Sequence, residues 1–506
     1  MTSIQIFDGN DTIGGNKIYL EEKGKGIFLD FGMNFKKYAN FYQEYLLPRS
    51  SRGIYDLIHL NLIPRLNIYR KDLIPSDLDT SLFRALNVEG IVVSHAHMDH
   101  CGNIGLLNPE YPIISSTTTL LLLKAMLDTT SVKLGSDIAY YSPKNQKNNG
   151  RVLESDRYKE ICRDIICIDD FTESFDDFFT KCAKSRKESI GGRISNIKNG
   201  AFEMEIKAHE VDHSIYGATA YLIYGDNTIA YTGDFRLHGK QGNKSEEFFR
   251  NAKDASVLII EGTRTSREDI DESEDMVYNN CLKTAEEAKG LIVADFTARN
   301  FERLEIFNQI AEKIGRSLII TAKDAYLLNA LEKADNIKII EDLLVYGELK
   351  SVRQYWERSL VNEGSEITYI DPIDISIEQD KYIVCFSLFD LKNLLDIQPN
   401  QGTYIYSSSE AFEEESEFDF IRLHNWLKHL KFEIFGFEII EVGDRLKPRF
   451  MEGYHASGHA SKSDLIKAIE IADPDIIIPV HTDNPNWFIK QFDNSVLLKD
   501  YEAYKF

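Results

Sequence analysis

The chain has 506 residues, of which 43% are hydrophobic and 27% are charged, and its formal net charge is −23 at pH 7. This length exceeds what one hydrophobic core usually supports, so we expect two domains or one domain interrupted by another. The acidic charge argues against polyanion binding through the overall electrostatic field, although local basic patches can still contact phosphate.

Neither export nor membrane insertion is expected for this sequence. The N-terminal MTSIQIFDGN lacks a basic region followed by an apolar stretch, and the longest apolar runs are too short to cross a bilayer. The six cysteines form no CxxC pair, which argues against a disulfide framework or a thiolate zinc site. We therefore expect a cytoplasmic protein with no membrane partner.

The first segment alternates apolar and polar residues between glycine-rich turns, as antiparallel strands do. Residues 36–87 differ because they are aromatic, leucine-rich and basic, and we expect helices and loops inserted there before the next strand. That strand, VEGIVVS at 88–94, leads directly into a cluster of histidines. The cluster is therefore expected on a loop at the carboxyl end of the strand.

The sequence SHAHMDHCG places His95, His97, Asp99 and His100 within six residues. Imidazole nitrogen and carboxylate oxygen are ligands that suit zinc and its first-row neighbours. One metal ion needs three or four ligands, and the adjacent Asp99 and His100 point in different directions, so we expect two metal ions to share this loop. A purely structural role is disfavoured, because no core gains from packing so many polar groups.

Residues 130–200 are polar and charged, which indicates a second insertion rather than core. Its basic segment at 181–198 is either a phosphate-contacting surface or a solvated face, and neither reading is favoured. Strand-like sequences follow, and two more candidate ligands come just after them: His213 in VDHSIYG and Asp234 in YTGDF. Taken singly, each could also be a histidine beside a strand or an aspartate in a turn.

Helices and strands alternate after residue 263, which indicates an α/β unit with a parallel sheet. The last segment returns to the earlier style, with YHASGHASKSDLIKAIEIAD followed by the strand IIIPV and then His481. The apolar spacing of DLIKAIEIA predicts a short amphipathic helix. His481 thus follows the end of a strand, as the first histidine cluster does.

HAHMDH, followed in order by DHS, TGD and IPVH, resembles the metallo-β-lactamase family of dinuclear metal hydrolases. EGT, HASGHAS and IPVH further resemble the β-CASP nucleases, and among them the RNase J group. The resemblance implies an α/β fold, a metallo-β-lactamase αββα sandwich with an inserted β-CASP α/β domain. It divides the chain into a first metallo-β-lactamase part at 1–263 with insertions near 36–87 and 130–200, a β-CASP domain at 264–436, and a C-terminal metallo-β-lactamase part at 437–506.

The same resemblance implies two zinc ions per chain, with Mn²⁺ or Mg²⁺ as substitutes. By this resemblance His95, His97 and His213 hold one ion, Asp99, His100 and His481 hold the other, and Asp234 bridges them. Glu261 in LIIEGT falls where the family has its first β-CASP acidic residue, and it would orient a ligand imidazole. The alternative for Glu261 is a surface carboxylate at the end of a strand. The predicted catalytic residues are Asp99, His459 and Glu261.

Contacts to substrate phosphate are also implied by the resemblance. His459 matches the β-CASP histidine beside the scissile phosphate and could protonate the leaving group. His455, Ser457 and Gly458 match a pocket for a terminal 5′ phosphate, although His455 could simply pack under its loop. Asn300 and Arg303, in the loop ADFTARNFERL, are the expected contacts to the RNA backbone.

The sequence departs from the RNase J pattern in three places. IPVHTDN lacks the Gly-Glu that often follows the histidine, DHSIYG replaces the frequent HSIPD, and no bacterial C-terminal domain follows His481. We therefore expect a compact form similar to archaeal or divergent relatives. Whether the chain forms a homodimer stays open, as does a protein partner that compensates for the acidic net charge.

The predicted function is zinc-dependent hydrolysis of phosphodiesters in single-stranded RNA, from 5′-monophosphate ends in the 5′ to 3′ direction, with endonuclease activity left open. One alternative is a metallo-hydrolase of a small phosphodiester or ester, which would not need a second domain to clamp a polymer. The other is a non-catalytic nucleic-acid-binding subunit, which would have no reason to keep all seven ligands.

Overall fold

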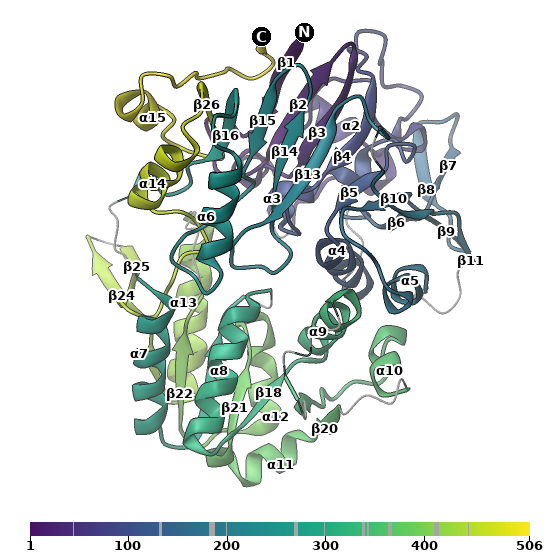
Figure 1. Ribbon diagram of the computed structural model, residues 1–506. Coiled ribbons are helices and arrows are strands. Elements are labelled where there is room, and N and C mark those ends of the chain that lie inside the picture. The colour runs from purple at the N-terminus through teal and green to yellow at the C-terminus, as the bar shows by residue number, and fades with distance from the viewer. Residues whose placement is uncertain are drawn as a thin grey trace.

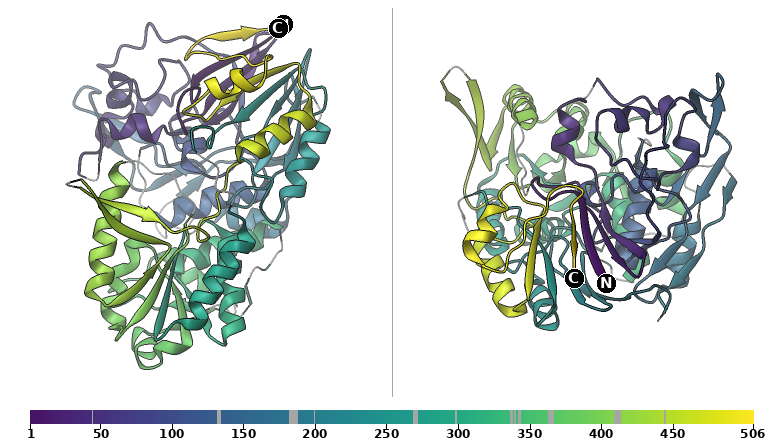
Figure 2. Two further views of the ribbon diagram at one scale, coloured as in Figure 1. Left: turned by 90° about the vertical axis from the view of Figure 1, so that its left-hand side faces the viewer. Right: turned by 90° about the horizontal axis from the view of Figure 1, so that it is seen from above.

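A computed structural model gives the structure of the chain, which forms two lobes (Figure 1). It describes every residue except 44, 131–133, 182–187, 199, 268–271, 298, 336–337, 339, 342–343, 363–366, 409–413 and 444. Both termini lie side by side in the upper lobe (Figure 2), because β27 (Ala503–Lys505) pairs antiparallel with β1 (Thr2–Asp8). No described helix combines the length and the apolar character that crossing a bilayer requires.

Two sheets pack face to face in the upper lobe. The first has eight strands in the order β12-β10-β5-β4-β3-β2-β1-β27, and the second has five in the order β13-β14-β15-β16-β26. The remaining bounds are β2 (Lys17–Glu22), β3 (Lys25–Phe31), β4 (Val88–Val92), β5 (Ile113–Ser115), β10 (Ile165–Cys167), β12 (Ile194–Asn196), β13 (Glu205–Glu210), β14 (Thr219–Tyr224), β15 (Thr228–Tyr231), β16 (Val257–Glu261) and β26 (Ile476–Val480). The strands expected at 88–94 and in IIIPV are therefore confirmed as β4 and β26.

The αββα layering follows from the alternation of side chains along the strands. In β16, Val257 and Ile259 point into the core between the two sheets, whereas Leu258 and Ile260 point outward against helices. Those helices are α6 (Gly242–Asn251) and α14 (Lys462–Ala472), and α14 is the amphipathic helix expected from DLIKAIEIA. The other outer face packs against α2 (Tyr55–His59) and α4 (Thr117–Thr129). The expected sandwich fold is confirmed.

The two proposed insertions differ in how far they enter the sheet. Within 36–87 the chain forms short helices and loops, as expected, beginning with α1 (Phe35–Ala39). The expectation for 130–200 was partly wrong, because β10 and β12 extend the eight-stranded sheet beside β5. Ile165 and Cys167 are buried there, but strands of three residues are too short for an alternating pattern to reveal them. Other elements of this segment are β6 (Tyr140–Tyr141), β7 (Lys144–Lys147), β8 (Val152–Ser155), β9 (Lys159–Cys162), α5 (Glu173–Thr180) and β11 (Glu188–Ile190).

The lower lobe is an α/β unit built on a seven-stranded parallel sheet, as the alternation after residue 263 predicts. Its strand order is β20-β19-β18-β21-β17-β22-β23, and every neighbouring pair is parallel. The strands are β17 (Leu291–Asp295), β18 (Ser317–Ile320), β19 (Leu344–Tyr346), β20 (Thr368–Ile370), β21 (Tyr382–Cys385), β22 (Gly402–Tyr406) and β23 (Phe432–Phe435). The helices are α7 (Glu274–Glu287), α8 (Phe301–Ile314), α9 (Ala322–Asp335), α10 (Tyr355–Asn362), α11 (Pro372–Ile377), α12 (Leu394–Ile397) and α13 (Glu414–His429).

The boundaries between the lobes follow the course of the chain. It leaves the five-stranded sheet after β16 and re-enters it at β26, with the whole parallel sheet in between. The hairpin of β24 (Phe437–Val442) and β25 (Arg445–Phe450) lies against α13, and Phe437 belongs to the core of the lower lobe. We propose domain boundaries near 263 and 451, the second later than the sequence-based value of 436.

A buried ion network joins the lobes close to the metal-ligand candidates. Arg236, fully buried in the upper lobe, donates to Asp212 at 2.9 Å, to Glu274 of α7 at 3.0 Å, and to Glu302 of α8. Arg303 of α8 binds the other oxygen of Glu274 at 2.9 Å. On the opposite side α4 packs against α9 (Figure 1). Because buried charges tolerate little misplacement, these two contacts fix the lower lobe against the site.

Candidate metal centre

The loop after β4 is held in place by close backbone contacts with glycines. A Cβ atom on Gly32 would lie 1.5 Å from the carbonyl oxygen of Asp99, and one on Gly14 would lie 2.9 Å from Asp99 Cβ. Gly15 donates its N–H to the same carbonyl oxygen at 3.0 Å. Only glycine leaves room for this approach, so the glycine-rich first turn of the sequence supports the metal loop directly.

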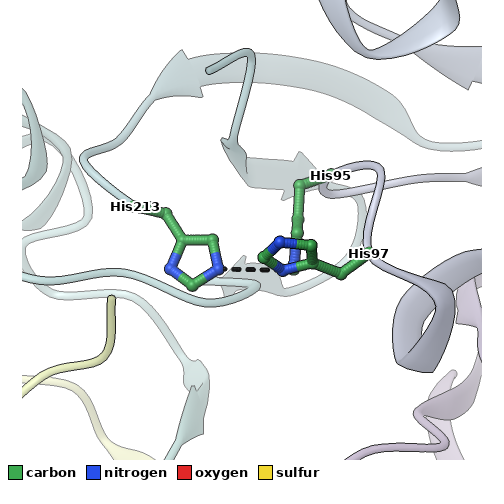
Figure 3. A group of neighbouring side chains, drawn as sticks. All are labelled: His95, His97 and His213. Carbon is green, nitrogen blue, oxygen red and sulfur yellow. Dashed lines mark hydrogen bonds between the residues drawn. The ribbon is translucent and has the colours of Figure 1, made fainter. Parts of the chain in front are cut away.

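Three imidazoles from two distant segments converge beside this loop. His97 Nδ1 lies 3.0 Å from His95 Nε2 and 3.1 Å from His213 Nε2 (Figure 3). His95 and His97 precede α3 (Met98–Cys101), whereas His213 comes from the loop between β13 and β14. Their nitrogens form one group that could hold a metal ion.

A second group lies next to the first, and Asp234 lies between the two. His481 Nε2 lies 3.1 Å from Asp99 Oδ2, and His100 completes this group. Asp234 Oδ2 lies 3.0 Å from His100 Nε2 and 3.7 Å from His95 Nε2. The structure therefore gathers all seven sequence-predicted ligands, with one carboxylate between the two groups.

Buried polar atoms in this cluster indicate that a cation fits there. Asp234 Oδ1 is buried and makes no hydrogen bond to any described residue, whereas the buried Asp234 Oδ2 and His100 Nε2 have only each other, 3.0 Å apart. Such atoms are costly unless a ligand satisfies them. Imidazole nitrogens with carboxylate oxygens are the donor set of zinc and related divalent metals. The cluster thus has the ligand types of a divalent-metal site and a buried carboxylate oxygen that a metal ion could satisfy.

The protonation of the first group favours metal binding. Burial, together with repulsion from the neighbouring imidazoles, lowers the pKa of His95 and His97 well below the usual value. Burial and the charge of His459 lower the pKa of His213 to about 4. All three rings are therefore neutral at physiological pH, which is the form that ligates metals.

The second group carries negative charge that requires a cation. Burial acts to raise the pKa of Asp99, but His100 and His481 outweigh it and lower that pKa. Burial likewise opposes the ionisation of Asp234, yet nearby imidazoles hold its pKa well below normal. Burial disfavours charge on His100, but Asp234 and Asp30 raise its pKa. Two ionised carboxylates thus meet here, and either a proton on His100 or a metal ion can balance them.

Asp30, which sequence reasoning missed, orients this part of the site. Its carboxylate accepts hydrogen bonds from Ser94 N and Ser94 Oγ, both at 2.7 Å, and from the Tyr231 hydroxyl at 2.5 Å, and it lies 2.7 Å from His100 Nδ1. Asp30 also has a left-handed backbone conformation, with φ of 58°. The available signal was an acidic residue inside the apolar strand sequence GIFLDFG.

Asp30→Asn should weaken metal binding by roughly 10- to 100-fold. The aspartate has two acceptor oxygens for its hydrogen-bond donors, whereas the asparagine amide has only one. Competition with a chelator of known zinc affinity measures this change. Asp226→Asn, at an exposed turn, is the matched control and should leave the affinity unchanged. Equal affinities for the two variants would show that Asp30 does not orient His100.

Glu261 and His459 form a pair beside the metal-ligand candidates. Glu261 is 1% exposed, so its reading as a surface carboxylate is wrong. Its oxygens lie 3.1 and 3.2 Å from His459 Nδ1 and accept hydrogen bonds from Phe235 N and Thr263 Oγ1. Thr263 Oγ1 also lies 2.9 Å from His481 Nδ1. Glu261 thus contacts His459 directly and reaches the imidazole of His481 only through Thr263, which sequence reasoning missed.

Electrostatics favour the protonated form of His459. Burial opposes its charge, but Glu261 and Asp234 outweigh burial and raise the pKa of His459. The charge of His459 in turn lowers the pKa of Glu261 against the effect of burial. A protonated imidazole on an anionic partner is suited to donate a proton. A further group is close enough to hold a metal ion and consists of Asp234, Glu261, His459 and His481. His459 is therefore a candidate for either a proton donor or a metal ligand.

The expected 5′-phosphate pocket is only partly present. His455 turns both ring nitrogens toward backbone carbonyls, those of Ser408 at 3.0 Å and Gly436 at 2.6 Å, so it packs under its loop. Gly458 accepts a hydrogen bond from His213 Nδ1 at 2.5 Å, and a Cβ atom there would lie 2.7 Å from Ser214 Oγ. Its role is close packing against His213. Ser457, whose Oγ accepts the His459 N–H at 3.2 Å, is a partly exposed residue.

The expectation that Asn300 and Arg303 contact RNA is wrong, because both side chains are buried. Asn300 is 3% exposed and caps α8 by accepting the backbone N–H of Arg303 at 3.0 Å. Arg303 is 0% exposed, and its guanidinium binds Glu274 and Ser407. Both side chains serve the fold of the lower lobe, and neither reaches a surface where RNA could bind.

Comparisons with known proteins agree with this arrangement. Residues 444–486 match the family described as "Zn-dependent metallo-hydrolase RNA specificity domain", and this range contains Ser457, His459 and His481. Ribonuclease J of Mycoplasma genitalium is 22% identical over 495 residues, which cover 95% of this chain and 68% of that protein. Ribonuclease J of Methanocaldococcus jannaschii is 22% identical over 487 residues, which cover 94% and 90%.

The fold also has a counterpart among solved structures. The crystal structure of a protein of unknown function from Enterococcus faecalis V583 has a TM-score of 0.64 and 22% sequence identity, and the match covers 99% of both chains. At this identity the likeness supports the fold alone.

Proposed function

We propose that this chain, an RNase J-like metallo-β-lactamase and β-CASP hydrolase, cleaves phosphodiesters of single-stranded RNA with two zinc ions held by the seven-residue cluster. The observation that carries the proposal is the pairing of two ligand groups around one buried carboxylate, with the His459–Glu261 pair beside them. The Zn-dependent metallo-hydrolase family matched at 444–486 supports zinc as the metal.

When bound, the metal ions supply Lewis acidity toward a phosphate and an activated water at neutral pH. The residues of the chain supply the rest. Glu261 engages Nδ1 of His459, whereas Nε2 has no hydrogen-bond partner among the described residues. His459 therefore presents a protonated Nε2, which donates its proton to the 3′ oxygen as that oxygen leaves phosphorus.

The finer part of the proposal concerns where the RNA is cut. We propose 5′ to 3′ exonuclease action from 5′-monophosphate ends, supported by Ser457, whose hydroxyl lies beside His459. We also place the protein in the cytoplasm, since Cys101, Cys167, Cys281 and Cys385 carry free thiols, as a reducing compartment would leave them.

A time course on one RNA carrying a 5′ monophosphate, a 5′ triphosphate or a 5′ hydroxyl tests the proposal, with products identified by mass spectrometry. We expect mononucleotides, released fastest from the monophosphate form. Internal fragments that do not depend on the 5′ end would be consistent with the proposed metal site but would contradict the proposed terminal-phosphate pocket. Absence of cleavage with zinc bound would favour a small-substrate hydrolase or a non-catalytic RNA-binding protein instead.

A further inference from the structure

We propose that Arg299 binds a backbone phosphate of the RNA next to the metal centre. The assignment rests on the proposed function, since it names the residue by which the lower lobe holds the substrate at that site. Arg299 replaces Asn300 and Arg303 as the RNA contact of the loop 294–304.

The position of Arg299 follows from the parallel sheet. β17 ends at Asp295 and α8 begins at Phe301, so Arg299 lies on the loop at the carboxyl edge of the sheet. Its Nη1 lies 3.4 Å from the carbonyl oxygen of Ala96, the residue between His95 and His97. A side chain from the lower lobe thus reaches the metal loop of the upper lobe.

Arg299 is partly exposed, and it differs from the buried arginines near the site in having no ion-pair partner among the described residues. Arg236 and Arg303 are both paired with Glu274, whereas no carboxylate of the described residues lies within ion-pair distance of Arg299. Burial lowers the pKa of the Arg299 guanidinium, and the more distant charges of Cys101 and Asp99 only partly oppose this effect. An unpaired and partly desolvated cation is costly, and a phosphate oxygen would remove that cost.

A second cation, Lys323, interacts electrostatically with Arg299. Lys323, at the start of α9, has a lowered pKa because of burial and, in part, the charge of Arg299. The carboxylates of Asp324 and Asp390 also act on Lys323, but burial raises the pKa of Asp324 to about 7, which makes Asp324 a weak counter-ion. Lys323 is exposed, so it adds to the positive charge that a polyanion meets near Arg299.

The alternative role for Arg299 is that of a strut between the lobes. A strut needs a firm contact, but the hydrogen bond to Ala96 is long and joins a single carbonyl oxygen. The planar fork of a guanidinium matches two oxygens of one phosphate, and such charged bidentate contacts are stronger than a neutral hydrogen bond. The geometry therefore fits an anion contact better than a strut.

The test uses the full-length protein and a short, fluorescently labelled single-stranded RNA, with binding followed by anisotropy at several salt concentrations after metal chelation. Arg299→Gln should weaken binding about tenfold, as expected for loss of a charged hydrogen bond. It should also reduce the slope of log affinity against log salt by about 0.7, the value for one phosphate contact on a single strand. Arg299→Lys should restore the slope but not the full affinity.

Arg358→Gln is the matched control, because Arg358 is an exposed arginine of α10 in the same lobe, and it should change neither quantity. Thermal unfolding and zinc content verify that the variants keep the fold and the metal. An unchanged affinity and slope for Arg299→Gln, in a protein that still binds and cleaves RNA, would overturn the assignment alone. A lower unfolding temperature with an unchanged slope would establish the strut instead. If the unaltered protein binds no RNA, the proposed function fails as well.

Discussion

Asp234→Asn should reduce RNA cleavage by about 10³-fold or more, the order of magnitude lost when a charge-stabilising group is removed from an active site. Asp234 lies between the two ligand groups, with Oδ2 3.0 Å from His100 Nε2 and 3.7 Å from His95 Nε2, and its Oδ1 is buried without a hydrogen-bond partner among the described residues. Asparagine keeps the shape of the side chain but lacks the negative charge that a bridging ligand provides.

The same substitution should remove most of the stabilisation that zinc binding gives to the folded protein. A metal ion that binds only the folded state stabilises it by about 2.7 kcal/mol when its free concentration exceeds the dissociation constant 100-fold. We expect added zinc to raise the unfolding temperature of the unaltered protein and to have a much smaller effect on Asp234→Asn. Unfolding scans with and without zinc measure this difference, and elemental analysis gives the metal content.

Asp226→Asn again serves as the control, since it changes an exposed carboxylate of the same lobe. It should retain cleavage, zinc content and the response of the unfolding temperature to zinc. If Asp234→Asn retained two zinc ions and cleaved RNA within about tenfold of the unaltered protein, a margin well below the effect of a lost charge-stabilising group, the ligand set proposed here would be incorrect.

The convergence of the seven ligand candidates could be predicted because the signals are local. His95, His97, Asp99 and His100 lie within one loop, and His213, Asp234 and His481 each follow a strand of the upper lobe. The parallel pairing of β16 with β15 and β26 brings the ends of these strands to one edge of the sheet. The sandwich and the parallel sheet of the lower lobe could be predicted for a similar reason, since both depend on periodic apolar patterns.

What sequence reasoning missed depends on contacts between distant segments. Asp30 and Thr263 matter because their oxygens contact His100 and His481, respectively. No spacing in the sequence predicts those contacts. In the loop 294–304, both Arg299 and Arg303 were available, and only the packing of α8 against Glu274 and Ser407 shows that Arg303 points into the core. Residue type predicted the chemistry of these positions, whereas tertiary structure decided which side chain is free to perform it.

His459→Ala should reduce RNA cleavage by roughly 10²- to 10⁴-fold, the usual contribution of a positioned general acid. The raised pKa of His459 and its contact with Glu261 support a proton donor. Zinc content should stay unchanged, because the two groups of imidazoles and carboxylates around Asp234 are complete without it. Steady-state cleavage of RNA, with the metal measured on the same preparation, checks both expectations.

The leaving group distinguishes proton donation from the other roles that His459 could have. The p-nitrophenolate released from a p-nitrophenyl phosphodiester leaves without protonation, so His459→Ala should slow hydrolysis of this substrate far less than that of RNA, whose leaving 3′ oxygen is strongly basic. An equal loss with both substrates would assign His459 to stabilising charge on the phosphate rather than to proton transfer. Loss of zinc from His459→Ala would make it a metal ligand, together with Asp234, Glu261 and His481, which lie close enough to complete such a site.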